Sequence, residues 1–171
     1  MLIESNNQKV LALIFKYPTT GLTIREIARK LKISPPTVSR IAKDLERKNL
    51  VTIKKESNQY KVLGNIENEK FKDLKRIYNL FSLLPLRDFL IRELNPNLIV
   101  VFGSYSTGED VENSDIDLFV DSEKRKKINL SKFEKKLARG IHLIVSSFRN
   151  LPSELRSNVI NGVILYGVIE I

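Results

Sequence analysis

Two aspartates separated by a single residue, Asp115 and Asp117, share one short segment with a glycine–serine pair, "GSYSTGEDVENSDIDLFV", which runs from Gly103 to Val120. Glycine lets a backbone approach a ligand closely. Free N–H groups at the start of a helix attract anions, and the Ser104 hydroxyl adds one more donor. In a strand, Asp115 and Asp117 would point the same way, about 6.6 Å apart. Carboxylates beside a phosphate site suit Mg²⁺, so the segment predicts metal-assisted chemistry on a phosphate.

The residues around this segment indicate how it is held. Residues 98–102, "LIVVF", form a continuous apolar run, which predicts a buried strand. Gly103 and Ser104 would then turn the chain into a helix, and Gly108 permits a second close approach of the backbone. Apolar residues alternate with the aspartates, so we expect a second strand over residues 115–120 with both carboxylates on one face.

The order of these residues is a Gly-Ser pair, a later glycine, and Ser-Asp-x-Asp before apolar residues. It resembles the polymerase-β-type nucleotidyltransferases, especially the small archaeal and bacterial minimal nucleotidyltransferase domains. The later stretch "LPSELRSNVINGVILYG" looks like that family's closing helix and strand, so the resemblance covers roughly residues 96–171. It implies an α/β fold with a small mixed sheet, and Mg²⁺ with a nucleoside triphosphate as ligand or substrate. By their places in the motif, Asp115 and Asp117 would bind the metal and act in catalysis, and four residues would bind the nucleotide: Gly103, Ser104, Gly108 and Ser114.

Two positions depart from the family pattern. Ser106-Thr107 stand where the family often has Ala-Arg, which removes one basic phosphate contact. The family's third carboxylate, which helps to deprotonate the attacking hydroxyl, lies on a later strand. In the matching stretch 140–147, "GIHLIVSS", His142 stands in its place. Imidazole is a poor ligand for Mg²⁺, but it could act as a general base near neutral pH. Three interpretations follow: transfer impaired or lost while nucleotide or metal binding is kept, transfer retained, or a purely structural domain.

Basic residues are concentrated in the first third of the chain. The net charge is +9; residues 1–64 hold 13 Lys and Arg against 5 Asp and Glu, whereas the remaining residues hold 16 against 15. This excess predicts a surface for the phosphate backbone of a nucleic acid, and a solvated lysine-rich surface is the alternative. The later run Lys124–Lys127, "KRKK", is interpreted first as a solvated loop, and otherwise as part of a nucleic-acid or substrate-phosphate surface.

Helical patterns fill the first fifty residues. Apolar residues recur at helical spacing in 8–17 and in 24–31, where Thr23 and Glu26 stand in capping-box positions. Ser34 is a good N-cap and the two prolines after it suit a first turn, so a third helix is predicted to run to about Asn49.

The stretch 50–64 alternates apolar and polar residues around a polar tip at 56–58, which predicts a β-hairpin with a basic outer face. Three helices followed by a hairpin, carried by "TIREIARKLKISPPTVSRIAKDLERKNLVTI", resemble the winged helix-turn-helix family over about 60 residues.

This second resemblance implies that the third helix enters the major groove of DNA with its N-terminal end. Arg40 is the best candidate for a bidentate contact to guanine. Lys54 and Lys55 on the hairpin would reach the backbone or the minor groove. The other outward residues of the helix are Thr37, Ser39 and Lys43. The alternative is a winged helix that docks on a protein.

Composition excludes several classes of protein. There is no cysteine, so a disulfide framework and a thiolate metal site are excluded. No apolar run approaches the roughly 18 residues of a membrane span. Residues 1–4 lack the basic head and apolar core of a signal peptide, so we expect no export and a cytoplasmic protein. Many Lys, Glu and Ile residues with a single Met favour a thermophile as the source.

The sequence thus predicts a two-domain α+β protein, with a winged helix-turn-helix over residues 1–64, a helical linker over 65–95 and a nucleotidyltransferase-like domain over 96–171. The leading hypothesis is a transcriptional regulator that binds double-stranded DNA as a homodimer, while its second domain senses a nucleotide or builds the dimer. The rival is an active transferase that moves a nucleoside monophosphate onto a protein, RNA or small molecule. Here the resemblance implies a separately encoded helical toxin as one kind of partner. A scaffold that uses both folds without a ligand is the third hypothesis.

Overall fold

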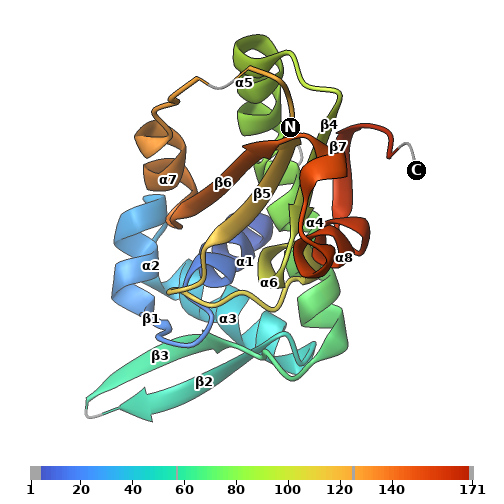
Figure 1. Cartoon of the computed structure of the whole chain (residues 1–171). Helices are drawn as coiled ribbons and strands as arrows, with labels where there is room; N and C mark the ends of the chain where they lie inside the picture. Colours follow the sequence, from blue (N-terminus) through green and yellow to red (C-terminus); the bar gives the residue numbers. More distant parts are fainter. Residues whose placement is uncertain (1–4, 57, 125, 170–171) are drawn as a thin grey trace. The chain divides into compact units, whose positions relative to one another are not determined.

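The chain divides into two compact units, residues 1–75 and 76–171 (Figure 1). The computed structural model describes residues 5–56, 58–124 and 126–169. Each unit has its own sheet, so the predicted two-domain α+β architecture is confirmed. The division falls inside helix α4 (Glu69–Ser82), in the stretch predicted as a helical linker. None of the helices in the described ranges has the length and hydrophobicity needed to span a bilayer.

The helices of the first unit are α1 (Asn6–Lys16), α2 (Ile24–Leu31) and α3 (Pro35–Arg47), as the periodicity predicts. Each begins at a hydroxyl N-cap, which satisfies a backbone donor that has no partner within the helix. The predicted capping box of α2 is confirmed: Thr23 Oγ1 accepts from Glu26 N at 3.2 Å, and Glu26 Oε2 accepts from Thr23 N at 2.8 Å. The hydrogen bonds from Thr23 to the Glu26 carboxylate lower the pKa of Glu26. Helix α3 ends two residues before the predicted Asn49, whose φ of 58° is left-handed.

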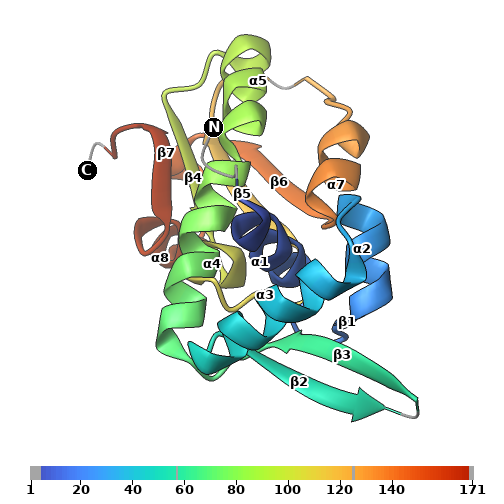
Figure 2. The ribbon, with the colours of Figure 1, turned by 180° about the vertical axis from the view of Figure 1, so that it is seen from behind.

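The sheet of the first unit has the strand order β1-β3-β2 with antiparallel pairing, and Figure 2 shows it from behind. Strands β2 (Val51–Glu56) and β3 (Gln59–Gly64) are the predicted hairpin, and β1 (Leu22–Thr23) adds a short third strand. Residue 57, at the predicted tip, lies outside the described residues. The core of this unit is apolar and includes Val10, Ile14, Ile27, Val38, Ile41, Leu45 and Val62.

Helix α4 starts in the first unit. The Phe71 ring lies 5.1 Å from that of Phe15, centroid to centroid, and it is buried. A Cβ at Gly64 would overlap this ring, so the hairpin ends in a glycine where Phe71 packs. Leu83 is the N-cap of α5 (Leu84–Leu94), whose Pro85 suits a first turn. Two helices, α4 and α5, therefore cover most of the stretch predicted as a helical linker.

The second unit is built on a mixed sheet with the strand order β6-β5-β4-β7. Strands β5 and β6 are parallel, and the other two pairs are antiparallel. This confirms the small mixed sheet that the sequence predicts. The strands are β4 (Leu98–Phe102), β5 (Ile116–Asp121), β6 (Ile141–Ser146) and β7 (Val163–Gly167). The remaining helices are α6 (Ser104–Thr107), α7 (Ser131–Leu137), α8 (Ser153–Ile160) and a 3₁₀ turn (Phe148–Asn150).

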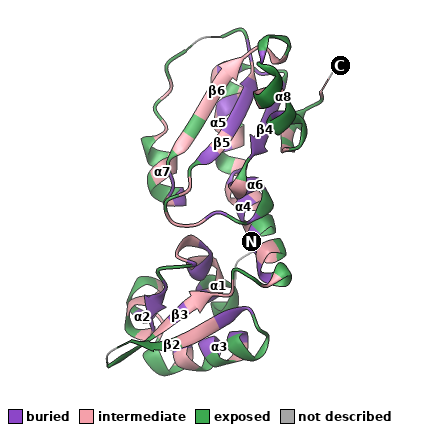
Figure 3. Cartoon of the chain, turned by 60° about the horizontal axis from the view of Figure 1, so that its bottom comes forward, coloured by how far each residue is buried: buried purple, intermediate pink, exposed green. Residues whose placement is uncertain are grey.

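Both faces of this sheet are covered, which is why β4 is buried at every position, as predicted (Figure 3). On one face, alternate strand residues such as Ile99 and Leu118 pack with α5 and with Leu137 of α7. On the other, Val100 and Phe119 pack with Val159 of α8. The sequence did not predict α7, because only two of its seven residues, Phe133 and Leu137, are apolar. Strand β5 begins at Ile116, so Asp115 directly precedes it.

Candidate functional site

The predicted acidic site lies where three strand ends meet. Strand β4 runs antiparallel to β5, so the end of β4 lies beside the start of β5, and Phe102 pairs with Asp117. Strand β6 runs parallel to β5, so its start lies at the same end of the sheet, and Asp117 pairs with His142. The topology therefore brings together residues that are distant in the sequence.

The carboxylate of Asp117 lies between Gly103 and His142. Its Oδ1 is 3.0 Å from His142 Nδ1. Its Oδ2 lies against Gly103, where a Cβ would be only 2.8 Å away. Gly103 also has a φ of 70°, which favours glycine over other residues. Both space and backbone conformation therefore require a glycine beside Asp117.

Asp115 is exposed and lies opposite Gly140 at the start of the β5–β6 pair. A Cβ at Gly140 would overlap Asp115 Oδ1, so the carboxylate lies over this glycine. Ile116 N donates to Gly140 O at 2.9 Å and fixes the register of the two strands here. Asp115 thus lies directly before β5 and Asp117 within it, at the same end of the sheet.

The predicted nucleotide-binding residues lie in the turns around this site. Gly103 and Gly108 bracket helix α6, and Gly108, with a φ of 82°, is its buried C-cap. Ser104 is half-buried at the first position of α6. Ser114 Oγ accepts from Val111 N at 2.9 Å, which closes the turn before Asp115. Their contact with a nucleotide stays a prediction.

The Ser106-Thr107 departure has a structural explanation. Ser106 is buried, and its hydroxyl donates to Gly103 O at 2.7 Å. Thr107 is exposed, and its hydroxyl oxygen lies 3.1 Å from Ser104 O and 2.9 Å from Glu109 Oε2. These hydroxyls close the α6 turn on itself, so this turn extends no long basic side chain toward a phosphate.

The residues present fit one divalent cation better than two. Mg²⁺ commonly binds one or two carboxylates together with substrate phosphates, and Asp115 with Asp117 offers such a pair. Among the described residues, no group of three or more His, Cys, Asp or Glu side chains is arranged to hold a metal ion. Histidine takes the position opposite Asp117, so the chain does not supply a third carboxylate there.

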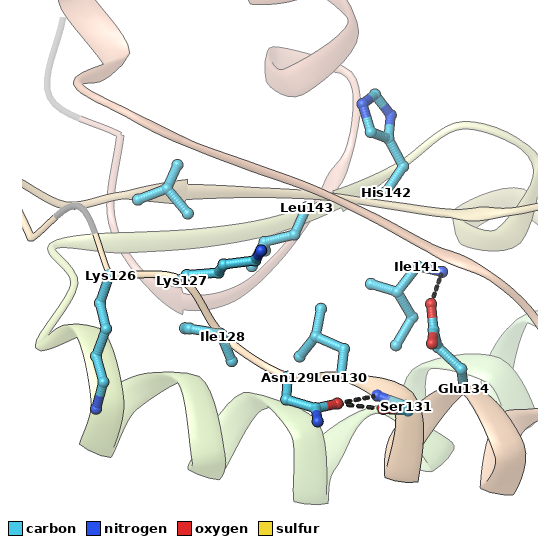
Figure 4. Close-up of a pocket in the computed structure, with 11 residues that line it drawn as sticks. Lys126, Lys127, Ile128, Asn129, Leu130, Ser131, Glu134, Ile141, His142 and Leu143 are labelled. Atoms are coloured by element: carbon cyan, nitrogen blue, oxygen red, sulfur yellow. Dashed lines mark hydrogen bonds between the residues drawn. The ribbon is translucent and has the colours of Figure 1, made fainter.

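A hollow of about 890 Å³ lies along β6 (Figure 4). Its apolar lining includes Ile128, Leu130, Ile141 and Leu143. Figure 4 shows His142 directed away from Ile141, because successive residues of a strand face opposite sides. His142 also contributes to the lining, so the hollow reaches the residue that contacts Asp117.

The predicted basic run at 124–127 is partly described. Lys126 Nζ lies 2.6 Å from Glu93 Oε2, and this ion pair lowers the pKa of Glu93. Lys124 and Lys127 are exposed, and residue 125 lies outside the described residues. The geometry agrees with a solvated loop.

The predicted DNA-reading helix α3 exposes one face along its N-terminal half. Arg40 and Lys43 are exposed, while Thr37 and Ser39 are half-buried. Ser34 Oγ lies 2.8 Å from Thr37 Oγ1, so Thr37 takes part in the helix cap. Val38, Ile41, Ala42 and Leu45 are buried on the opposite side, which confirms the predicted inward face.

The hairpin carries Lys54 and Lys55, both exposed. A hollow of about 550 Å³ lies between the starts of α2 and α3 and the hairpin, and its lining includes Arg25, Ser39 and Tyr60. Sequence reasoning did not select Arg25 or Tyr60. The position of Arg25 in the first turn of a basic helix and the place of Tyr60 near the hairpin tip were the available signals.

The glycine turn, the paired aspartates and the mixed sheet define a nucleotidyltransferase-like domain, joined in one chain to a winged helix. Residues 85–169 match the family model "Polymerase beta, Nucleotidyltransferase", and residues 10–59 match the model of the MarR family. The chain therefore combines a MarR-like DNA-binding regulator domain with a domain of the nucleotidyltransferase fold.

One solved structure with a detectable likeness is that of MepR, a transcription regulator of the Staphylococcus aureus multidrug efflux pump MepA. Its TM-score is 0.38 and its sequence identity 24%, over 53% of this chain and 65% of that chain. The match thus spans less than two thirds of MepR. No curated protein matches the chain.

Proposed function

We propose that the protein is a transcriptional regulator whose winged helix binds double-stranded DNA and whose second domain binds a Mg²⁺–nucleoside triphosphate as a ligand. Three observations support this function: the net charge of the first 64 residues, the exposed basic side chains of α3 and the hairpin, and the paired aspartates beside the Gly103 turn. The winged-helix match supports a homodimer on paired half-sites.

The observation that favours a ligand-binding domain over an active transferase is the contact of His142 Nδ1 with Asp117 Oδ1 at 3.0 Å. A histidine stands at the strand position where the resembling transferases have a carboxylate, and imidazole cannot supply the negative charge that hard cations require. We infer that nucleotide transfer is impaired, whereas the pair of aspartates is kept.

The residues of the site divide between binding the cation and binding the phosphates. Asp115 and Asp117 hold the cation, which would neutralise charge on the bound polyphosphate. Gly103 and Ser104 face the phosphates with backbone N–H groups and one hydroxyl, while Gly108 and Ser114 shape the turns around them. His142 orients the Asp117 carboxylate through its Nδ1 contact.

Ligand binding and transfer are separated by two measurements on the full chain. Calorimetric titration with each of the four ribonucleoside triphosphates in Mg²⁺ should show saturable binding for at least one, and Asp115→Asn should remove it. Incubation with the same nucleotide, labelled at its α-phosphate, should leave no label on protein, RNA or small molecules. An absence of binding to all four would remove the ligand-sensing function.

The role of His142 is tested by His142→Asp, with His142→Asn as the control. The aspartate restores a third carboxylate, so it should raise Mg²⁺ affinity or label transfer. The asparagine keeps hydrogen-bonding capacity and adds no charge, so it should raise neither. If His142→Asp changes neither quantity, His142 is not the cause of impaired transfer.

DNA binding is tested by selecting duplexes from a random pool and measuring affinity against salt concentration. A regulator should prefer some duplexes, and its affinity should fall steeply as salt rises, because phosphate contacts release counterions. Sedimentation with the selected duplex should give two chains per palindromic site. Binding without sequence preference would leave a non-specific DNA-binding protein.

An active transferase is the second candidate, favoured by the retention of both aspartates and the glycine turn. Its acceptor would be a protein, such as a helical toxin-type partner, an RNA or a small molecule. Transfer of α-phosphate label that is lost in both Asp115→Ala and Asp117→Ala would establish it. Absence of DNA binding, nucleotide binding and transfer would leave a scaffold.

A further inference from the structure

A buried ion pair lies outside the predicted site. Arg139 donates from NH2 and Nε to Asp110 Oδ2, at 3.1 and 3.2 Å. The two side chains are only 2% and 1% exposed. Burying two charges costs desolvation that their attraction barely offsets, so such a pair is weak evidence for a role in stability. Its location suggests another role.

A third residue completes the cluster. Asn79, on α4 and itself buried, donates from Nδ2 to Asp110 Oδ1 at 2.7 Å and to Tyr105 O at 2.9 Å. Both oxygens of Asp110 are therefore engaged, one by an amide and one by a guanidinium. Arg139 also donates from NH1 to Ala138 O at 2.9 Å, which orients the guanidinium on its own turn.

The cluster joins the loop that leads to Asp115 with the turn against which Asp115 lies. Asp110 is followed by the turn of residues 111–114, which is closed by the Ser114 N to Val111 O and Val111 N to Ser114 Oγ hydrogen bonds. Asp115 comes next. Arg139 directly precedes Gly140, the residue over which Asp115 Oδ1 lies. Short, hydrogen-bonded connections thus run from both charges of the pair to Asp115.

We propose that Asp110, Arg139 and Asn79 are positioning residues: they fix the 110–115 loop against the 138–140 turn and so hold Asp115 beside Asp117 for a divalent cation. The inference rests on the proposed cation site, which it deepens. A loose connection would let the exposed Asp115 carboxylate move away from Gly140, and cation affinity depends on such outer contacts by about 10–100-fold.

Asp110→Asn and Asn79→Ala test the cluster, with Mn²⁺ as a spectroscopic probe of the cation site. Free Mn²⁺ measured by electron paramagnetic resonance should show a dissociation constant at least about 10-fold higher in both variants than in the wild type. Arg139→Lys keeps the charge and should recover part of the affinity that Arg139→Met loses. Lys126→Ala, which removes an exposed ion pair, is the matched control and should bind Mn²⁺ as the wild type does.

Hydrogen exchange of the metal-free full chain gives a readout that does not depend on the proposed function. The variants should exchange faster in residues 111–116 and 140–142, with the rest of the second unit unchanged. If the variants exchange faster there but the wild type binds no Mn²⁺, the positioning role is kept and the cation site is removed. Faster exchange spread over the whole sheet, or an unchanged dissociation constant beside measurable wild-type binding, would overturn the proposal. Should Asp110→Asn fail to fold, the milder pair of Asn79→Ala and Arg139→Lys decides.

Discussion

The winged helix and the sheet domain hold their candidate functional side chains in different ways. Arg40, Lys43 and Lys54 project into solvent from elements whose other face forms an apolar core. Asp117 instead lies between Gly103 and His142, where even one added methyl group would collide. The basic side chains therefore depend on charge and solvent exposure. The position of the Asp117 carboxylate depends on the volume of the residues beside it.

The two units should therefore respond differently to mutation. An exposed basic side chain can be removed while its helix keeps its packing, so the loss should appear in binding alone. A residue beside Asp117 changes the position of a carboxylate, so small changes of volume should alter the chemistry of the site.

The largest effect is expected for Asp117→Asn, which removes the charge of one of the two proposed carboxylate ligands. Affinity for Mg²⁺–nucleotide should fall by at least about 100-fold, because changes to the partners of metal ligands alone already cost up to that much. DNA affinity should stay the same. Calorimetry on the full chain measures the first and fluorescence anisotropy the second. Asp121→Asn, at the other end of the same strand, is the control. An equal loss in the control would contradict the assigned site.

Arg40→Ala should have the next largest effect. It should cost roughly 1–3 kcal/mol on a selected duplex and relax sequence preference at one position, because a bidentate base contact is lost. Arg47→Ala, on the same helix and paired with Asp44 in solvent, should leave the preference intact. Competition binding with single-base variants measures both. An unchanged preference in Arg40→Ala would remove Arg40 from the reading surface.

Alkaline pH should affect the second unit through its buried tyrosines. Burial raises the pKa of Tyr105 and that of Tyr78 above the ordinary 10.0. The unfolded chain therefore loses these protons first, so the stability they contribute is present below pH 10 and falls as pH rises beyond it. Tyr105→Phe should cost about 1 kcal/mol near neutral pH through the lost hydrogen bond with Ser82, and it should flatten the alkaline decline.

The free energy of unfolding at pH 8 and at pH 10.5 is measured by urea titration, with a spectroscopic probe in each unit. Tyr166→Phe, at an exposed position on β7, is the matched control and should change neither value. A decline that is equally steep in Tyr105→Phe would show that other groups cause it.

The smallest effect is expected in acid, in the first unit. Hydrogen bonds from Thr23 lower the pKa of Glu26 below 4.5. The stability from this carboxylate is therefore present above about pH 4.5 and is lost as pH falls through its lowered value. Glu26→Gln keeps the capping box, but the free energy of unfolding should fall by about 0.3 kcal/mol at neutral pH, the low end for a charge near a helix start. The stability of this variant should fall less steeply with decreasing pH than that of the wild type. Thermal unfolding at pH 7 and pH 3.5, with Glu67→Gln as the control, tests this.

Local patterns allowed much of the fold to be predicted. The caps at Thr23 and Ser34 and the apolar run 98–102 act over a few residues, and the elements they predict are confirmed. The helix over 131–137 was missed because it has one buried apolar residue, Leu137, and is held by the rest of the sheet domain.

The candidate site was predictable only in part, because much of its geometry is not local. The spacing of Asp115 and Asp117 is a property of one strand. The contact of Asp117 with His142 depends on the parallel register of β5 and β6, 25 residues apart. The Asp110–Arg139 pair spans 29 residues, and nothing in the sequence distinguishes these two charges from the exposed ones around them.

The parallel pairing of β5 with β6 also has a consequence for the order of folding. The first unit relies mainly on helix caps and a hairpin, whose contacts close short loops, whereas the β5–β6 pair must wait until the connection through α7 has been made. Domains fold as units from the N-terminus during synthesis. Pulse-labelled exchange during refolding should protect α2 and α3 before β6. We therefore expect the winged helix to fold on the ribosome before the sheet domain has been synthesised.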